Sequence, residues 1–192
     1  MRGAILLNNR SKISFNIAYC GIISALAILV MFVSVVPSLT YMMPAFAGVI
    51  VWSVYAQIHS DKAFRWAVMT YLATSLLSLI LVPEIQARTF FILFFGYYPL
   101  LREKLVGVKF WAVRFIFKLL LFNVTAVISY FIAVELFGVA DTLEGLEWFG
   151  DYAIYAFWGL GNLAFLCYDF ALTYVFYAFR HWFKPIMDKK LK

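Results

Sequence analysis

The sequence has little charge for its length, and this scarcity is its first informative property. Charged residues make up only 14% of the 192 residues, whereas hydrophobic residues make up 65%. Soluble domains are on average about 25% charged and about 45–50% apolar. A soluble fold of this size could not bury so much apolar surface, but a bilayer can solvate the outer faces of apolar helices. The composition therefore excludes an ordinary soluble domain and predicts an all-α, polytopic membrane protein.

Cysteine and histidine are also scarce, with two of each. Cys20 and Cys167 lie in apolar runs, form no CxxC pair and have no histidine nearby, so we interpret them as packed thiols. The sequence also lacks the HExxH, GxSxG and P-loop patterns that indicate a zinc hydrolase, a serine hydrolase or a nucleotide site. We therefore expect a protein that is not an enzyme and that has no cofactor and no metal.

Six apolar runs, bounded by turn residues or charges, account for most of the chain. A spanning helix needs about 20 apolar residues. The first run is too long for the apolar part of a cleavable signal and no small-x-small cleavage site follows it, so we expect it to persist as a helix. A single membrane domain over residues 1–192 is the simplest organisation, with helices at approximately 15–36, 41–58, 63–82, 89–101, 110–137 and 152–179.

The fourth run is the shortest, and its second half contains Gly96 and Pro99. About 13 helical residues rise about 20 Å, which is less than the roughly 30 Å of a bilayer core. Two interpretations stay open. The helix is either short and sheltered by its neighbours, or it continues as a bent segment past Pro99.

The charges are segregated between the two sides that these helices define. When successive connections are assigned to alternate sides, Arg88 is the only one of the 16 basic residues on the second side. The positive-inside rule then places both termini in the cytoplasm. We therefore interpret the net charge of +6 as a topology signal rather than as a nucleic-acid-binding surface. The other, outer side is acidic and carries Glu84, Glu135, Asp141, Glu144, Glu147 and Asp151.

Small residues recur on one face of the first predicted helix. Gly21 and Ala25 form a small-xxx-small pair, and Ala18 extends the same narrow face. Such a face lets the backbone of another helix approach closely. That helix belongs either to a partner protein or to the same chain, and the sequence leaves both alternatives open.

The connection between the first two runs, Val36–Pro44, is unusually apolar for an outer loop. It contains two prolines, a tyrosine and paired methionines, and it has no charge. One interpretation is a segment that folds back over the protein as a lid on a pocket. The alternative is a tight hairpin in the membrane interface.

The last two predicted helices carry a charged residue and an asparagine each at membrane depth. Lys118 and Asp169 lie at similar depth if these helices are antiparallel neighbours, and Asn123 and Asn162 lie nearer the midplane. Charges at that depth are costly unless they are paired or hydrated, so we predict a Lys118–Asp169 ion pair or a water-bridged contact. A polar clasp with no role in transport is the alternative to a functional site.

The small-residue face, the apolar connection with its prolines and the compact six-helix plan together resemble the substrate-binding S components of energy-coupling factor (ECF) transporters. The resemblance implies a small bacterial membrane protein that captures a vitamin or small metabolite outside the cell and has no ATPase of its own. It also implies that Ala18, Gly21 and Ala25 dock onto the transmembrane T component, which works with two ATPases. Gly21 stands where that family usually has an alanine.

The same resemblance implies a pocket in the outer half of the protein, walled by the fourth to sixth helices and covered by the Val36–Pro44 connection. Aromatic rings could stack there on a heterocycle, and asparagine side chains could bind its polar edge. The sequence carries no signature of a particular vitamin. From their positions, the expected substrate-binding residues are Tyr41, Glu84, Arg88, Asn123, Glu135, Trp148, Trp158 and Asn162.

Another class of protein fits the same composition. A membrane scaffold without a ligand, for instance an MreD-like subunit of a cell-envelope complex, would share the size, the topology and the helix-packing faces. Such a scaffold should be tightly packed beneath the Val36–Pro44 connection, where a transporter subunit should have a pocket. An enzyme of lipid metabolism would need clustered carboxylates or histidines near the interface, and the sequence has none.

Overall fold

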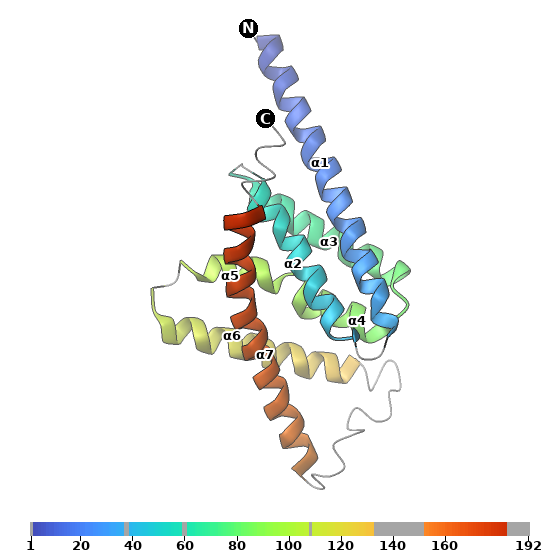
Figure 1. Cartoon of the computed structure of the whole chain (residues 1–192), viewed down its shortest axis with the longest axis vertical. Coiled ribbons are helices and arrows are strands. Elements are labelled where there is room, and N and C mark those ends of the chain that lie inside the picture. Colours follow the sequence, from blue (N-terminus) through green and yellow to red (C-terminus); the bar gives the residue numbers. More distant parts are fainter. Residues whose placement is uncertain (1, 37–38, 59–60, 108, 133–151, 184–192) are drawn as a thin grey trace. The chain divides into compact units, whose positions relative to one another are not determined.

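The computed structural model describes residues 2–36, 39–58, 61–107, 109–132 and 152–183, and the regular elements in these ranges are helices (Figure 1). Contacts divide the chain into two compact units, Met1–Gly107 and Val108–Lys192, and each is described by itself. The first unit contains α1 (Arg2–Phe32), η1 (Val33–Val35), α2 (Met42–Gln57), α3 (Ala63–Leu81), α4 (Ile85–Phe90), η3 (Phe91–Phe95) and α5 (Tyr98–Leu105). The second contains α6 (Trp111–Phe131), α7 (Ala153–Ala178) and η6 (Phe179–Phe183).

Four helical segments of the described chain are long and apolar enough to cross a membrane. They are Ile13–Val35, Ala63–Leu81, Trp111–Phe131 and Trp158–Trp182, and α2 is a shorter apolar helix. The all-α class predicted from the sequence is confirmed. The four spans support association with a lipid bilayer and fit a multi-pass membrane protein.

Helix α1 begins at Arg2, well before the start predicted at residue 15. The candidate membrane span within it is Ile13–Val35. Hydropathy marks the part of a helix that fits the bilayer core, whereas the backbone hydrogen bonds can continue beyond it into polar surroundings. In Figure 1 the first turns of α1 extend past the ends of α2 and α3.

Helix α3 has hydroxyl side chains on its buried face and large apolar side chains outside. Thr74 Oγ1 lies 3.0 Å from Ser24 Oγ on α1, and it donates to the Thr70 carbonyl oxygen at 2.7 Å. On the opposite face Leu76 is exposed and Ile80 is 83% exposed. Lipid tails are as apolar as leucine, so membrane helices associate through small and polar side chains rather than through the hydrophobic effect. The distribution on α3 is therefore the one that a lipid environment favours.

The core of the first unit joins α1, α2 and the fourth predicted segment. Met31, Ala47, Val51 and Phe91 are fully buried there and belong to one hydrophobic cluster. Small side chains such as Ala47 let α2 approach its neighbours closely. The core thus positions the connections that follow α1 and α3.

The fourth predicted helix is broken into α4, η3 and α5, and it runs from Ile85 to Leu105. Of the two interpretations left open by the sequence, the structure has the bent segment that continues past Pro99, which stands in the first turn of α5. The amide of Gly96 donates to the Phe91 carbonyl at 2.8 Å, five residues earlier, as in a π-turn. Tyr71 Oη of α3 donates to the Ile92 carbonyl at 2.7 Å and supports the irregular turn.

The break also explains why α2 carries a glycine at position 48. Pro99 has no N–H, so it cannot donate to the Phe95 carbonyl four residues earlier. That carbonyl lies against Gly48, where a Cβ atom would overlap it. Gly48 therefore permits the close approach of α2 and η3.

We expect Gly48→Ala to destabilise the first unit by about 1–3 kcal/mol, the range for overpacking a well-packed core. The new Cβ would overlap the Phe95 carbonyl oxygen, and the adjoining turn is fixed by the bond from Tyr71. Thermal unfolding of the full chain in detergent measures the effect.

Gly21→Ala is the matched control, because a Cβ at Gly21 has no atom within 4 Å to meet. Alanine favours the helix over glycine by about 1 kcal/mol. This variant should unfold at the parent temperature or slightly above it. Equal unfolding temperatures for the two variants would contradict the close approach at Gly48.

Candidate functional site

The eight predicted substrate-binding residues fall into three groups. Tyr41, Glu84 and Arg88 lie in the first unit, and Asn123, Trp158 and Asn162 lie in the second. Glu135 and Trp148 are outside the described residues. The structure therefore brings together two subsets, and each subset has its own geometry.

The described part of the Val36–Pro44 connection folds as a hairpin. The Leu39 amide donates to the Val36 carbonyl at 2.8 Å, and buried Thr40 donates through Oγ1 to the Ser34 carbonyl at 3.1 Å. Pro37 and Ser38 lie outside the described residues. These local hydrogen bonds fit the tight hairpin, which was one of the two interpretations of this connection.

Tyr41 links this hairpin to α4. Its hydroxyl donates to Gln86 Oε1 at 3.1 Å, and its ring meets the Phe90 ring edge-on with centroids 5.4 Å apart. Partial burial, and secondly the negative charge of Glu84, raise the pKa of the Tyr41 hydroxyl above its ordinary value. Tyr41 is still 55% exposed, so its ring is accessible.

Arg88 and Glu84 have different surroundings. Arg88 Nη1 donates to the Leu79 carbonyl at 2.9 Å and to the Val82 carbonyl at 3.5 Å, at the carboxyl end of α3. A cation there satisfies carbonyls that have no partner within the helix. Glu84 precedes α4 as its N-cap residue, and its carboxylate makes no hydrogen bond or ion pair with the described part of the chain.

We call Tyr41, Glu84, Gln86, Arg88 and Phe90 the connection cluster. Three of its members were predicted from the sequence, and Gln86 and Phe90 were not. Both lie within six residues of Glu84, but no sequence pattern pairs them with Tyr41, because the contact joins the hairpin before α2 to α4, with α2 and α3 between them in the chain.

The small-residue face of α1 makes no helix contact within the first unit. Ala18, Gly21 and Ala25 are exposed there, and the space beside Gly21 is open. The core contacts of α1 are made from its other side, by residues such as Ala27 and Met31. Neither α2 nor α3 is therefore the helix that approaches this face.

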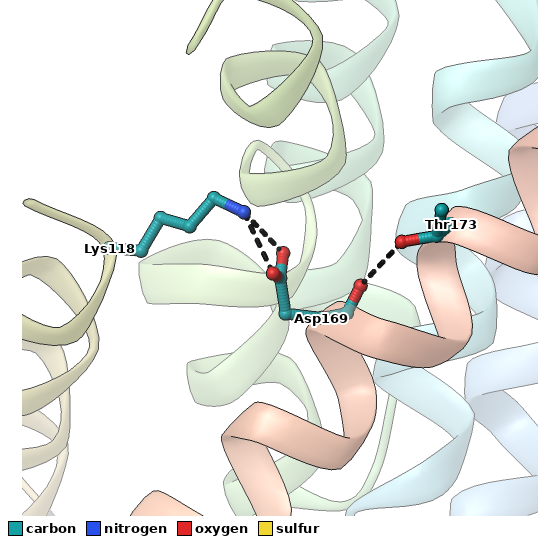
Figure 2. Close-up of polar contacts among 3 residues, drawn as sticks. All are labelled: Lys118, Asp169 and Thr173. Carbon is teal, nitrogen blue, oxygen red and sulfur yellow. Dashed lines mark hydrogen bonds and ion pairs between the residues drawn. The ribbon is translucent and has the colours of Figure 1, made fainter. Parts of the chain in front are cut away.

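Lys118 of α6 and Asp169 of α7 form a direct ion pair (Figure 2). Lys118 Nζ lies 2.7 Å from Asp169 Oδ2 and 2.9 Å from Oδ1, so both carboxylate oxygens accept. The two side chains are 10% and 22% exposed. Thr173 Oγ1 donates to the Asp169 backbone carbonyl at 3.4 Å, one turn further along α7. The two residues paired from their depth in the sequence are thus joined directly rather than through water.

Asn123 and Asn162 bind each other through reciprocal amide bonds. Each Nδ2 donates to the other residue's Oδ1, at 2.9 and 3.2 Å. Each also donates to the carbonyl four residues earlier, of Leu119 and Trp158 respectively. Both donors of each amide are therefore occupied, and only Oδ1 retains capacity to accept a bond from a ligand.

An aromatic stack lies between the ion pair and the amide pair in the chain order of α6 and α7. The rings of Phe122 and Phe165 are parallel within 9°, with centroids 4.7 Å apart. These two rings were not predicted from the sequence, although Phe122 follows Lys118 by four residues and Phe165 precedes Asp169 by four. Because the helices are antiparallel, one helical turn from the ion pair brings Phe122 opposite Phe165, and this register could have predicted the stack.

The cysteines are not joined to each other or to a partner cysteine in the structure. Cys20 is partly buried, but Cys167 is exposed, so its interpretation as a packed thiol was wrong. An apolar sequence around a cysteine does not distinguish a protein core from a lipid-facing surface. Within the described ranges, no group of three or more histidine, cysteine or acidic residues could hold a metal.

Comparison of the chain with protein-family models, curated proteins and solved structures gives no match.

Loss of either partner of the ion pair should destabilise the protein by on the order of 3 kcal/mol, because it leaves an uncompensated charge at membrane depth. The single variants are Lys118→Met and Asp169→Leu. The double variant replaces both charges by apolar side chains and should recover most of the loss. Equilibrium unfolding in mixed micelles measures all three.

Thr173→Ala is the control, since it leaves both charged side chains in place and removes the 3.4 Å bond from the Thr173 hydroxyl to the Asp169 carbonyl. It should unfold like the parent protein. A double variant no more stable than the single variants would show that the pair is not the source of the effect.

Proposed function

We propose that the protein is the substrate-binding subunit of an ECF-type uptake transporter for a vitamin or small metabolite. In this proposal both termini are cytoplasmic, substrate is captured on the outer side, and α1 docks onto a transmembrane T component. Two ATPases in the complex would supply energy. The observation that carries the proposal is the small-residue face of α1, which has the spacing for close helix contact and is exposed on the first unit.

The separation of the small-residue face from Tyr41 along the first helical hairpin supports the proposal. Ala18 and Gly21 lie in the first half of the span Ile13–Val35, near the basic amino-terminal segment, and Ala25 lies just past its midpoint. Tyr41 follows the other end of that span and contacts Gln86 of α4. A docking face toward the proposed inner side and a substrate-facing hairpin on the outer side can therefore belong to the same helical hairpin.

The connection cluster supports a binding role on the outer side. It combines an accessible aromatic ring at the start of α2 with a carboxylate and a side-chain amide at the start of α4. Convergent polar groups beside aromatic rings are the usual composition of small-molecule sites. The amide and ion pairs between α6 and α7 would then hold those two helices in register.

Substituting Gly21→Trp or Ala25→Trp should abolish co-purification with a T component and two ATPases that are expressed in the same cells. A bulky ring on this face would prevent close approach of the partner helix, and both positions are exposed, so the fold should survive. Affinity purification through a tag on the T component measures assembly.

Leu26→Trp is the matched control, because Leu26 is exposed on α1 but is turned by about 100° from Ala25. This variant should still assemble. If Gly21→Trp and Ala25→Trp assemble as well as Leu26→Trp, the docking face is elsewhere. If the parent chain assembles with no T component, the scaffold alternative gains support.

A further inference from the structure

The connection cluster contains one charge that its surroundings leave without a partner. Glu84 is partly buried beside Tyr41, and its carboxylate has no hydrogen bond or ion pair among the described residues. A carboxylate in such surroundings attracts a positive group more strongly than one in bulk water does. The Glu84 carboxylate therefore favours binding of a cation at the connection cluster.

Arg88 does not fill this role, although it follows Glu84 by four residues. Its guanidinium donates instead to the Leu79 and Val82 carbonyls at the end of α3. The carboxyl end of a helix carries a partial negative charge, which the arginine offsets. Arg88 therefore binds the end of α3, and the Glu84 carboxylate stays available to a cationic ligand.

The aromatic side chains of the cluster are held in a fixed arrangement next to this carboxylate. The hydrogen bond from Tyr41 to Gln86 and the edge-on contact with Phe90 fix the Tyr41 ring. The face of an aromatic ring attracts organic cations, and a carboxylate nearby adds to that attraction. The Gln86 amide nitrogen has no partner among the described residues and can donate to a polar edge of the same ligand.

The charge pattern of the sequence favours the same ligand class. On the side proposed to face outward, Arg88 is the single basic residue. The acidic residues on that side include Asp141, Glu144 and Glu147, whose positions lie outside the described residues. A surface of one sign raises the local concentration of ligands of the opposite sign.

We propose that the connection cluster binds the positively charged group of a small organic molecule, an ammonium or a cationic heterocycle, between Glu84 and the Tyr41 ring. The inference rests on the proposed function, because it names the substrate class for capture on the outer side. Gln86 would orient the ligand, and Arg88 would keep the end of α3 in place beneath it.

The test uses the full chain in detergent and four probes at pH 7. Benzylamine carries the proposed charge, benzyl alcohol is its neutral counterpart, benzoate is its anionic counterpart and calcium chloride supplies an inorganic cation. Benzylamine should raise the thermal unfolding temperature in a saturable way, and the other three should not. A calcium shift without a benzylamine shift, or equal shifts from benzylamine and benzyl alcohol, would overturn the proposal.

Glu84→Gln should weaken benzylamine binding by about tenfold or more, the loss expected when a charged partner of a bound cation is removed. Tyr41→Leu should also weaken it, whereas Tyr41→Phe should keep most of the affinity because the ring is retained. Unchanged affinity in Glu84→Gln would refute the site. If Glu84→Gln fails to fold, the comparison of Tyr41→Leu with Tyr41→Phe decides the question.

Asp61→Asn is the control for a nonspecific charge effect. Asp61 is exposed and precedes the first residue of α3, at the opposite end of that helix from Glu84. It should bind benzylamine like the parent chain. Co-purification with the T component is measured separately, so loss of cation binding with assembly intact would refute only the ligand class. Cation binding without assembly would refute the transporter and keep the site.

Discussion

A backbone carbonyl or a charged side chain at membrane depth has no water to bond, so its partner must come from the protein. The described structure meets this constraint in different ways. Tyr71 donates to a carbonyl in the π-turn of the fourth segment. Ser24 and Thr74 join α1 to α3, and Lys118 joins α6 to Asp169 on α7. Each contact fixes one helix against another or supports a break in one.

The same constraint explains what could be predicted from the sequence. Long apolar runs can only be helices in a bilayer, so the all-α class and the approximate helix positions followed from hydropathy. A lysine and an aspartate at the same depth in two neighbouring helices stabilise each other, and this requirement alone predicts the pair of Lys118 and Asp169. The reciprocal bonds of Asn123 and Asn162 follow the same antiparallel register.

Other features depend on contacts that have no local pattern. The clash-free approach of Gly48 to Phe95 depends on a proline that lies 51 positions further along the chain. The bond from Tyr41 to Gln86 joins the hairpin before α2 to α4, and these two segments come together only when α2 and α3 are placed. Hydropathy also misplaced the start of α1, since it reports where a helix fits lipid and not where its backbone hydrogen bonds begin. Most contacts of the candidate site likewise join residues that no local sequence pattern pairs.

The bond between Tyr41 and Gln86 has a consequence for how the hairpin after α1 behaves over time. A hydrogen bond between neutral groups contributes a net of about 1 kcal/mol. At that strength roughly one molecule in six has the bond open at any moment, since 1.4 kcal/mol corresponds to a tenfold ratio. The edge-on contact with Phe90 still holds the ring when this bond opens. The ring therefore stays in place while its hydroxyl exchanges partners, and a molecule arriving from solution meets a fixed ring with an exchangeable polar group.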